Sequence, residues 1–108
     1  MPKFVLAYHG GGIPESEEEQ AKHMAAWGEW MGSHSAAFVD MGAPTGQAKT
    51  VSAGGAVEDG GGSNPLTGYG IIEAADIDAA VEIAKGCPMV TLSDGTVEVA
   101  EAFEIPDM

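Results

Sequence analysis

The sequence predicts a single α+β domain spanning residues 1–108, in which two helices cover one face of a four-stranded antiparallel sheet. Three observations support this fold class. Short apolar segments rich in strand-forming residues flank two segments with helical periodicity. Each helical segment follows a residue that suits an N-cap. A length of 108 residues fits one domain with a modest core, to which a second subunit would add buried surface.

The first half of the chain predicts a strand, a helix and a further strand. Residues Lys3 to His9 form a compact apolar segment, followed by three consecutive glycines. Ser16 stands three residues before Glu19, which is the spacing of a capping box, so we expect a helix from about Glu17 to Gly32. Residues Ala36 to Met41 predict the second strand.

The middle of the chain predicts strands separated by a long polar loop. Residues Ala48 to Ala53 have the composition of a strand, and residues Gly54 to Gly68 are rich in glycine. We expect this loop to be mobile and to form one wall of a cleft. Residues Tyr69 to Ala74 predict the strand that follows it.

The last third predicts a second helix and the final strand. Asp76 suits an N-cap, and Gly86 suits the helix end. Between them, an apolar stripe has helical spacing and consists of Ile77, Ala80, Val81 and Ala84. Residues Val97 to Ile105 alternate apolar and polar side chains, as in a strand with one buried face.

The resulting order contains the β-α-β-β-α-β pattern of the ferredoxin-like plait, which has one strand fewer than the five predicted strand segments. In this arrangement both helices cover the same face of the sheet and the opposite face stays bare. Because the strands carry many apolar residues, we expect a second copy of the chain to cover that face and form a homodimer.

Composition excludes several classes of partner and location. Seventeen acidic residues against four lysines give a net charge of −13, which opposes binding to nucleic acids and to anionic membranes. The single cysteine, Cys87, cannot form an intrachain disulfide and suits a reducing compartment. The short apolar run at the N-terminus fits neither a signal peptide nor a membrane span. We therefore expect a cytoplasmic protein.

The second half of the sequence contains an ordered series of segments: Val57-Glu58-Asp59-Gly60, Thr67-Gly68-Tyr69-Gly70-Ile71-Ile72-Glu73, Asp76-Ile77-Asp78-Ala79-Ala80, Gly86-Cys87-Pro88 and Gly95-Thr96-Val97-Glu98-Val99. With these segments the sequence resembles the YCII-related family in its DGPF-type branch, and the resemblance spans nearly the whole chain, from the first strand to Glu104. Two further glycines follow Asp59-Gly60, where the DGPF signature has proline and phenylalanine. The resemblance implies a dimeric α+β plait with a cleft beside the first helix.

The same resemblance implies a histidine and an aspartate that act on a small molecule. His23 stands where the family pattern has its histidine, and Asp40 is near the position of its acid. On a helix, His23 shares a face with Trp27 and Trp30, and a partly dry environment favours a neutral imidazole that can act as a base. The alternative interpretation is a half-exposed helix histidine and an ordinary acid at a strand end.

Four further residues are candidates for ligand binding. Trp27 and Trp30 are expected to line an apolar pocket or the core, Tyr69 begins a strand beside the long loop, and His9 stands at a glycine-rich cleft rim. The acidic residues after that rim oppose a phosphate site. No dinucleotide fingerprint and no tight Cys/His cluster occurs in the sequence, so we expect neither a cofactor nor a metal.

Two functions remain open from the sequence. The first is an enzyme that performs proton-transfer chemistry of a lyase, isomerase or dehalogenase type on a small organic acid or lactone, with His23 and Asp40 as its catalytic pair. The second is a non-catalytic ligand-binding or regulatory dimer that uses the same cleft. An imidazole and a carboxylate in contact within the cleft favour the first, and an apolar cleft without that pair favours the second.

Overall fold

A computed structural model describes residues 1–11 and 14–103 of the chain. In chain order the elements are β1 (Lys3–His9), α1 (Glu17–Ser33), β2 (Phe38–Pro44), β3 (Lys49–Val51), β4 (Val57–Asp59), β5 (Leu66–Glu73), α2 (Ile77–Ala84), α3 (Pro88–Thr91) and β6 (Thr96–Ala102). Both predicted N-caps are formed. Ser16 accepts a hydrogen bond from the Glu19 amide at 3.1 Å, and Asp76 accepts one from the Ala79 amide at 2.8 Å.

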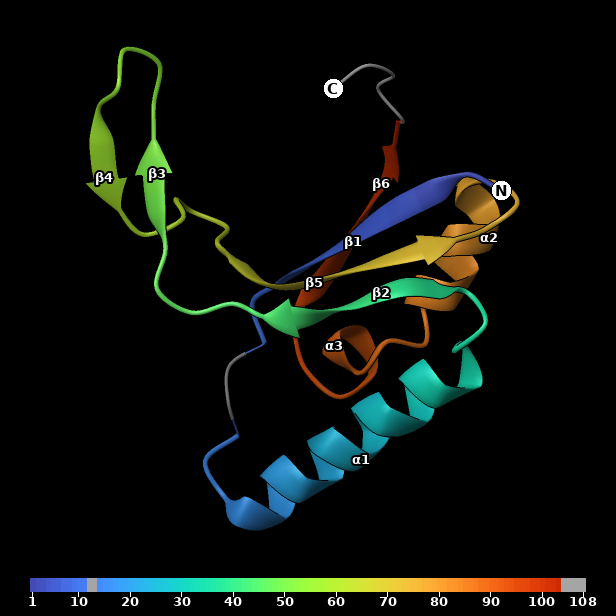
Figure 1. Cartoon of the computed structure of the whole chain (residues 1–108). Coiled ribbons are helices and arrows are strands. Elements are labelled where there is room, and N and C mark those ends of the chain that lie inside the picture. Colours follow the sequence, from blue (N-terminus) through green and yellow to red (C-terminus); the bar gives the residue numbers. More distant parts are fainter. Residues whose placement is uncertain (12–13, 104–108) are drawn as a thin grey trace.

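The main sheet has four antiparallel strands in the order β2-β5-β1-β6, which confirms the predicted plait. Figure 1 shows α1 and α3 below this sheet, and α2 packs on β1 and β6. The molecule measures 45 × 36 × 19 Å, so it is a thin two-layer structure. Within the described residues no helix is both long enough and apolar enough to cross a membrane.

The segment between β2 and β5 differs from the prediction. Residues Lys49–Val51 do form a strand, but it pairs with β4 in a separate two-stranded hairpin that projects beyond the main sheet (Figure 1). The predicted loop over residues 54–68 therefore contains β4 and the first residues of β5. The glycines on either side concealed the short β4 strand, because their composition is typical of loops.

Other differences concern element ends. β6 stops at Ala102, and Phe103 is 79% exposed, so it is not the buried strand residue that the alternation predicted. Ile105 lies outside the described residues. The one-turn helix α3 begins at Pro88, a residue that sequence analysis used only as a helix stop.

The core forms where α1, α2 and α3 pack on the sheet. Along β1, Phe4, Leu6 and Tyr8 alternate toward the helices and are almost fully buried. Trp30 is the one buried residue of α1, and its indole N–H donates a hydrogen bond to the Ile83 carbonyl of α2 at 3.0 Å. This bond links the two long helices through a side chain that also packs in the core.

We call the opposite face of the sheet the open face, because none of the helices in the described part of the chain covers it. Val5 and Ala7 of β1 lie there beside Ile71 and Tyr69 of β5, according to the register of the two strands. All four residues have intermediate exposure. This is the face that we expect a second copy to cover, and the homodimer stays a prediction.

Candidate ligand cavity

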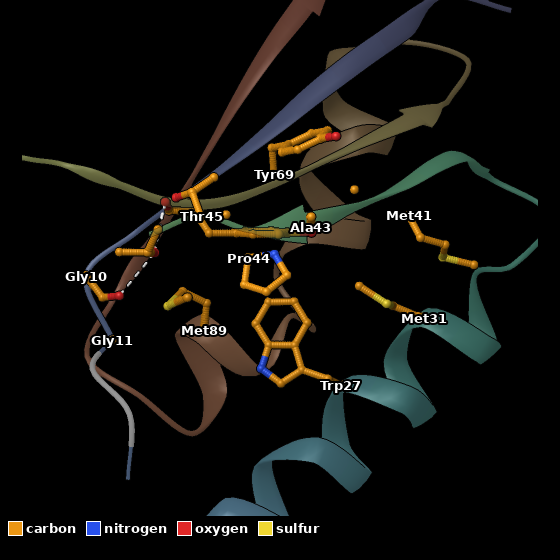
Figure 2. A pocket seen from close by; sticks show the side chains of 14 residues that line it. Gly10, Gly11, Trp27, Met31, Met41, Ala43, Pro44, Thr45, Tyr69 and Met89 are labelled. Atoms are coloured by element: carbon orange, nitrogen blue, oxygen red, sulfur yellow. Dashed lines mark hydrogen bonds between the residues drawn. The ribbon is translucent and has the colours of Figure 1, made fainter. Parts of the chain in front are cut away.

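A cavity of about 630 Å³ lies between α1 and the sheet. Its lining comes from β1 and the following glycines, from α1, α3, β2 and β5, and from the residue after β2 (Figure 2): Tyr8, Gly10, Gly11, Trp27, Met31, Met41, Gly42, Ala43, Pro44, Thr45, Thr67, Gly68, Tyr69 and Met89. Among these described lining residues none has a carboxylate, ammonium, guanidinium or imidazole group. The cavity is therefore an apolar site with a few hydroxyl and backbone groups.

An irregular edge strand forms one side of the cavity. Register shifts interrupt β2 between Phe38 and Asp40 and again between Asp40 and Ala43. Gly42 has a φ of +73°, and a Cβ at this position would collide with the Tyr69 carbonyl oxygen. Only glycine fits such a close approach in a left-handed conformation. The bulged segment on either side of Gly42 supplies Met41 and Ala43 to the cavity lining.

Tyr8 occupies the helix side of the sheet next to two glycines. A Cβ on Gly68 would lie 3.1 Å from the Tyr8 ring, and a Cβ on Gly70 would lie 3.2 Å from its hydroxyl oxygen, so both glycines leave room for this side chain. The ring packs edge-on with Trp27 at 5.1 Å between centroids. Within the described residues the buried Tyr8 hydroxyl has no hydrogen-bond partner.

The Tyr8 phenol is held in its neutral form. Burial raises the pKa of Tyr8 well above its usual range, and the nearby Cys87 is a smaller cause in the same direction. Burial likewise raises the pKa of the Cys87 thiol to about 11, against an opposing hydrogen bond from the Met89 backbone. Cys87 is fully buried, so it is a packed core thiol rather than an exposed nucleophile.

The structure separates the two tryptophans proposed for ligand binding. Trp27 lines the cavity and is partly buried. Trp30 is 6% exposed, is outside the cavity lining, and contacts Phe38 edge-on at 5.4 Å between centroids. The spacing of the two tryptophans along α1 places both on one side of the helix. Their positions differ because α2 packs against Trp30, which the spacing does not show.

Tyr69 borders the cavity, but its ring lies on the other side of the sheet. Figure 2 shows the ring on the opposite side of β5 from Trp27 and Met31. The pleat explains this position, because the buried neighbours Gly68 and Gly70 face the helices and Tyr69 alternates with them.

His9 is also directed away from the cavity lining, to the open face. Its Nδ1 atom lies 3.0 Å from the Asn64 carbonyl oxygen and 3.3 Å from that of Pro65, so Nδ1 carries a hydrogen and donates it. Its Nε2 atom lies 3.3 Å from a Glu98 carboxylate oxygen. The Nδ1 contacts connect β1 to the segment that precedes β5, whereas Nε2 lies near Glu98 of β6 without a hydrogen bond among the described residues.

The structure places His23 and Asp40 on different elements without joining them. His23 is half-buried on α1, one turn before Trp27, and is not among the residues that line the cavity. Asp40 is exposed on β2, where its carboxylate accepts a hydrogen bond from the Gly42 amide at 2.8 Å. Within residues 1–11 and 14–103 no hydrogen bond or ion pair joins His23 to Asp40, so the catalytic pair stays a prediction.

Several residues of the cavity were not candidates from the sequence. Besides Tyr8, these include the methionines Met41 and Met89. The alternation of Phe4, Leu6 and Tyr8 was a usable signal for Tyr8, since it places these residues on one face of β1. No sequence signal marks Met41, because its position depends on the bulge in β2. In the described part of the chain, no cluster of three or more His, Cys, Asp or Glu residues is arranged to hold a metal ion.

Comparison with known proteins gives one result that covers most of the chain. A family model described as the YCII-related domain matches residues 4–106. The search of curated proteins found no match.

Proposed function

We propose that this chain, which belongs to the family of YCII-related domains, binds a small uncharged apolar molecule in the cavity between α1 and the sheet. The observation that supports the proposal is the cavity itself, about 630 Å³ in volume and lined by Trp27, three methionines and small residues. Ligand sites in proteins are concave and mostly apolar, with few polar groups that orient the ligand. The proposal also places the protein in the cytoplasm as a homodimer.

The composition of the cavity lining favours neutral ligands over acids. A carboxylate that enters the cavity loses its hydration, and no cationic side chain is present among the described lining residues to replace it. The net charge of −13 also repels anions at long range. Of the ligand classes that the sequence suggested, we therefore retain lactones and related neutral carbonyl compounds and set aside free organic acids.

The contacts of the predicted catalytic pair support binding more than proton transfer. The Asp40 carboxylate is already used by the Gly42 amide, and His23 lies outside the cavity lining. A general base must reach the proton that it removes, directly or through one water. We therefore prefer the binding function, and replacement of His23 by Gln should leave ligand affinity within about twofold of wild type.

Two isosteric ligands test the proposal. Acetonaphthone is neutral and naphthoate is its anionic counterpart of similar shape. We expect acetonaphthone to bind at least about tenfold more tightly, since an unpaired carboxylate in the cavity costs more than about 1.4 kcal/mol. Isothermal titration or quenching of tryptophan fluorescence measures both affinities. Met31→Ala should weaken acetonaphthone binding, and Met24→Ala, on the exposed side of the same helix, should not.

Two outcomes would contradict the proposal. Naphthoate that binds as tightly as acetonaphthone would show that charge does not govern entry. Equal effects of Met31→Ala and Met24→Ala would place the ligand elsewhere on the molecule. Turnover of a lactone that disappears in the His23→Gln variant would instead support the enzymatic function.

A further inference from the structure

Met89 closes one end of the cavity between two glycines. The residue belongs to α3, is 8% exposed and lines the cavity next to Gly11 (Figure 2). A Cβ placed on Gly11 or on Gly95 would collide with the Met89 sulfur. The side chain therefore passes closely between the loop after β1 and the start of β6, in a space that exists only because both positions are glycine.

The two glycines differ in what else surrounds them. A Cβ on Gly95 would also lie 2.6 Å from the His9 carbonyl oxygen, so the backbone itself forbids a side chain there. The three heavy atoms nearest to a Cβ on Gly11 all belong to side chains, those of Met89 and Ser93. Backbone atoms therefore block movement of the Met89 sulfur toward Gly95, whereas a side chain at position 11 would push the sulfur away from Gly11.

We propose that Met89 determines the length of the ligand that the cavity accepts. This inference rests on the proposed binding function and adds a specificity-determining residue to it. Methionine is unbranched and flexible, so its side chain can fill the end of a cavity and adjust to an occupant. Shortening Met89 extends the cavity toward Gly11 and Gly95. A side chain at position 11 would push the Met89 side chain into the cavity, because backbone atoms block the side of Met89 that faces Gly95.

Alkyl phenyl ketones of increasing chain length test this proposal. When each affinity is divided by the ketone's partition coefficient into octanol, the wild-type protein should bind short members such as acetophenone or butyrophenone better than octanophenone. In Met89→Ala, the affinity for octanophenone relative to that for butyrophenone should rise about fifteenfold, since a methylene that becomes buried adds roughly fourfold to affinity and the shorter side chain leaves space for about two. Met89→Leu should give a smaller change in the same direction. Met24→Ala removes the same atoms from an exposed site and should change nothing.

A double-mutant cycle with Gly11 tests the direction in which Met89 moves. Gly11 has a φ of +64°, so Gly11→Ala also strains the backbone, and unfolding midpoints must be measured to confirm that each variant is folded. In the folded population, Gly11→Ala should weaken binding of butyrophenone about fivefold. In the Met89→Ala background the same substitution should have no effect on binding, because the displaced side chain is absent.

The outcomes distinguish this inference from the function on which it rests. If no ketone binds to wild type or to any variant, the binding function is wrong. If wild type binds short ketones but Met89→Ala and Met89→Leu keep the same chain-length preference, Met89 only packs in the core and the inference is wrong. An effect of Gly11→Ala that persists in the Met89→Ala background would also overturn it.

Discussion

Replacing Tyr8 by Phe should stabilise the protein. The Tyr8 side chain is 4% exposed, and its hydroxyl has no hydrogen-bond partner in the described part of the chain. A buried hydroxyl without a partner costs about 1–3 kcal/mol, whereas phenylalanine keeps the ring in place over Gly68 and beside Trp27. We expect the free energy of unfolding to rise by about 1 kcal/mol. In a domain of this size, that corresponds to an increase in Tm of roughly 4–8 °C.

Urea denaturation followed by circular dichroism measures this difference. Tyr69→Phe is the control for the loss of a tyrosine hydroxyl from the open face, where the group is not enclosed by the core. Because the expected dimer covers that face, this control is measured in the Ile71→Lys background, the expected monomer. The free energy of unfolding of this control should stay within about 0.5 kcal/mol of its Ile71→Lys parent. A Tyr8→Phe variant that is less stable than wild type by 1 kcal/mol or more would refute the reasoning, since it would reveal a hydrogen bond to the Tyr8 hydroxyl.

Three other predictions concern Trp30, Cys87 and the open face. Trp30→Phe removes the indole hydrogen bond to the Ile83 carbonyl, which keeps only the longer bond from the Gly86 amide at 3.3 Å, and it places a smaller ring in the core. The substitution should lower the free energy of unfolding by about 2 kcal/mol, measured by the same denaturation. Because burial raises the pKa of Cys87 from 9.0 to about 11, its contribution to stability is complete below pH 9 and is lost as the pH rises toward 11. Wild type should therefore lose about 2 kcal/mol more than Cys87→Ala across that interval, and parallel curves would contradict this. Light scattering should give twice the 11.0 kDa chain mass, and Ile71→Lys on the open face should give the monomer; a wild-type monomer at micromolar concentration would exclude the dimer.

The thin shape of the chain supports that last prediction. Its radius of gyration is 15.2 Å, whereas a compact domain of about 100 residues has a value near 13 Å. The excess comes from a two-layer body only 19 Å thick and from a hairpin that projects beyond it (Figure 1). An isolated two-stranded hairpin is marginally stable in water, so both features favour additional packing against a second copy.

Local signals in the sequence were sufficient for most of the main elements. Ser16 and Asp76 identified the helix starts, because N-cap chemistry acts within a few residues. The alternation of side chains along β1 was an equally direct signal for the strand, because it reflects burial on one face. The hairpin of β3 and β4 was missed because Val57–Asp59 is too short to show a period among its glycine-rich neighbours.

The candidate site was less predictable, since it depends on contacts between distant segments. Trp27 was identified, but its separation from Trp30 required knowledge of where α2 packs. His9 was expected at a cleft rim, yet its ring contacts carbonyl groups more than fifty residues away in the chain. The bulge at Gly42 creates the edge of the cavity, and nothing in the local sequence specifies the Tyr69 carbonyl that it approaches.

The position of a bound ligand is the sharpest test of the binding function. With methyl-labelled methionine, nuclear Overhauser effects can be recorded between the protein and the aromatic protons of acetonaphthone. The binding function predicts contacts to the methyl groups of Met31, Met41 and Met89, which line the cavity, and none to exposed Met24. Saturable binding with contacts only to Met24, or to none of the three cavity methionines, would contradict the account.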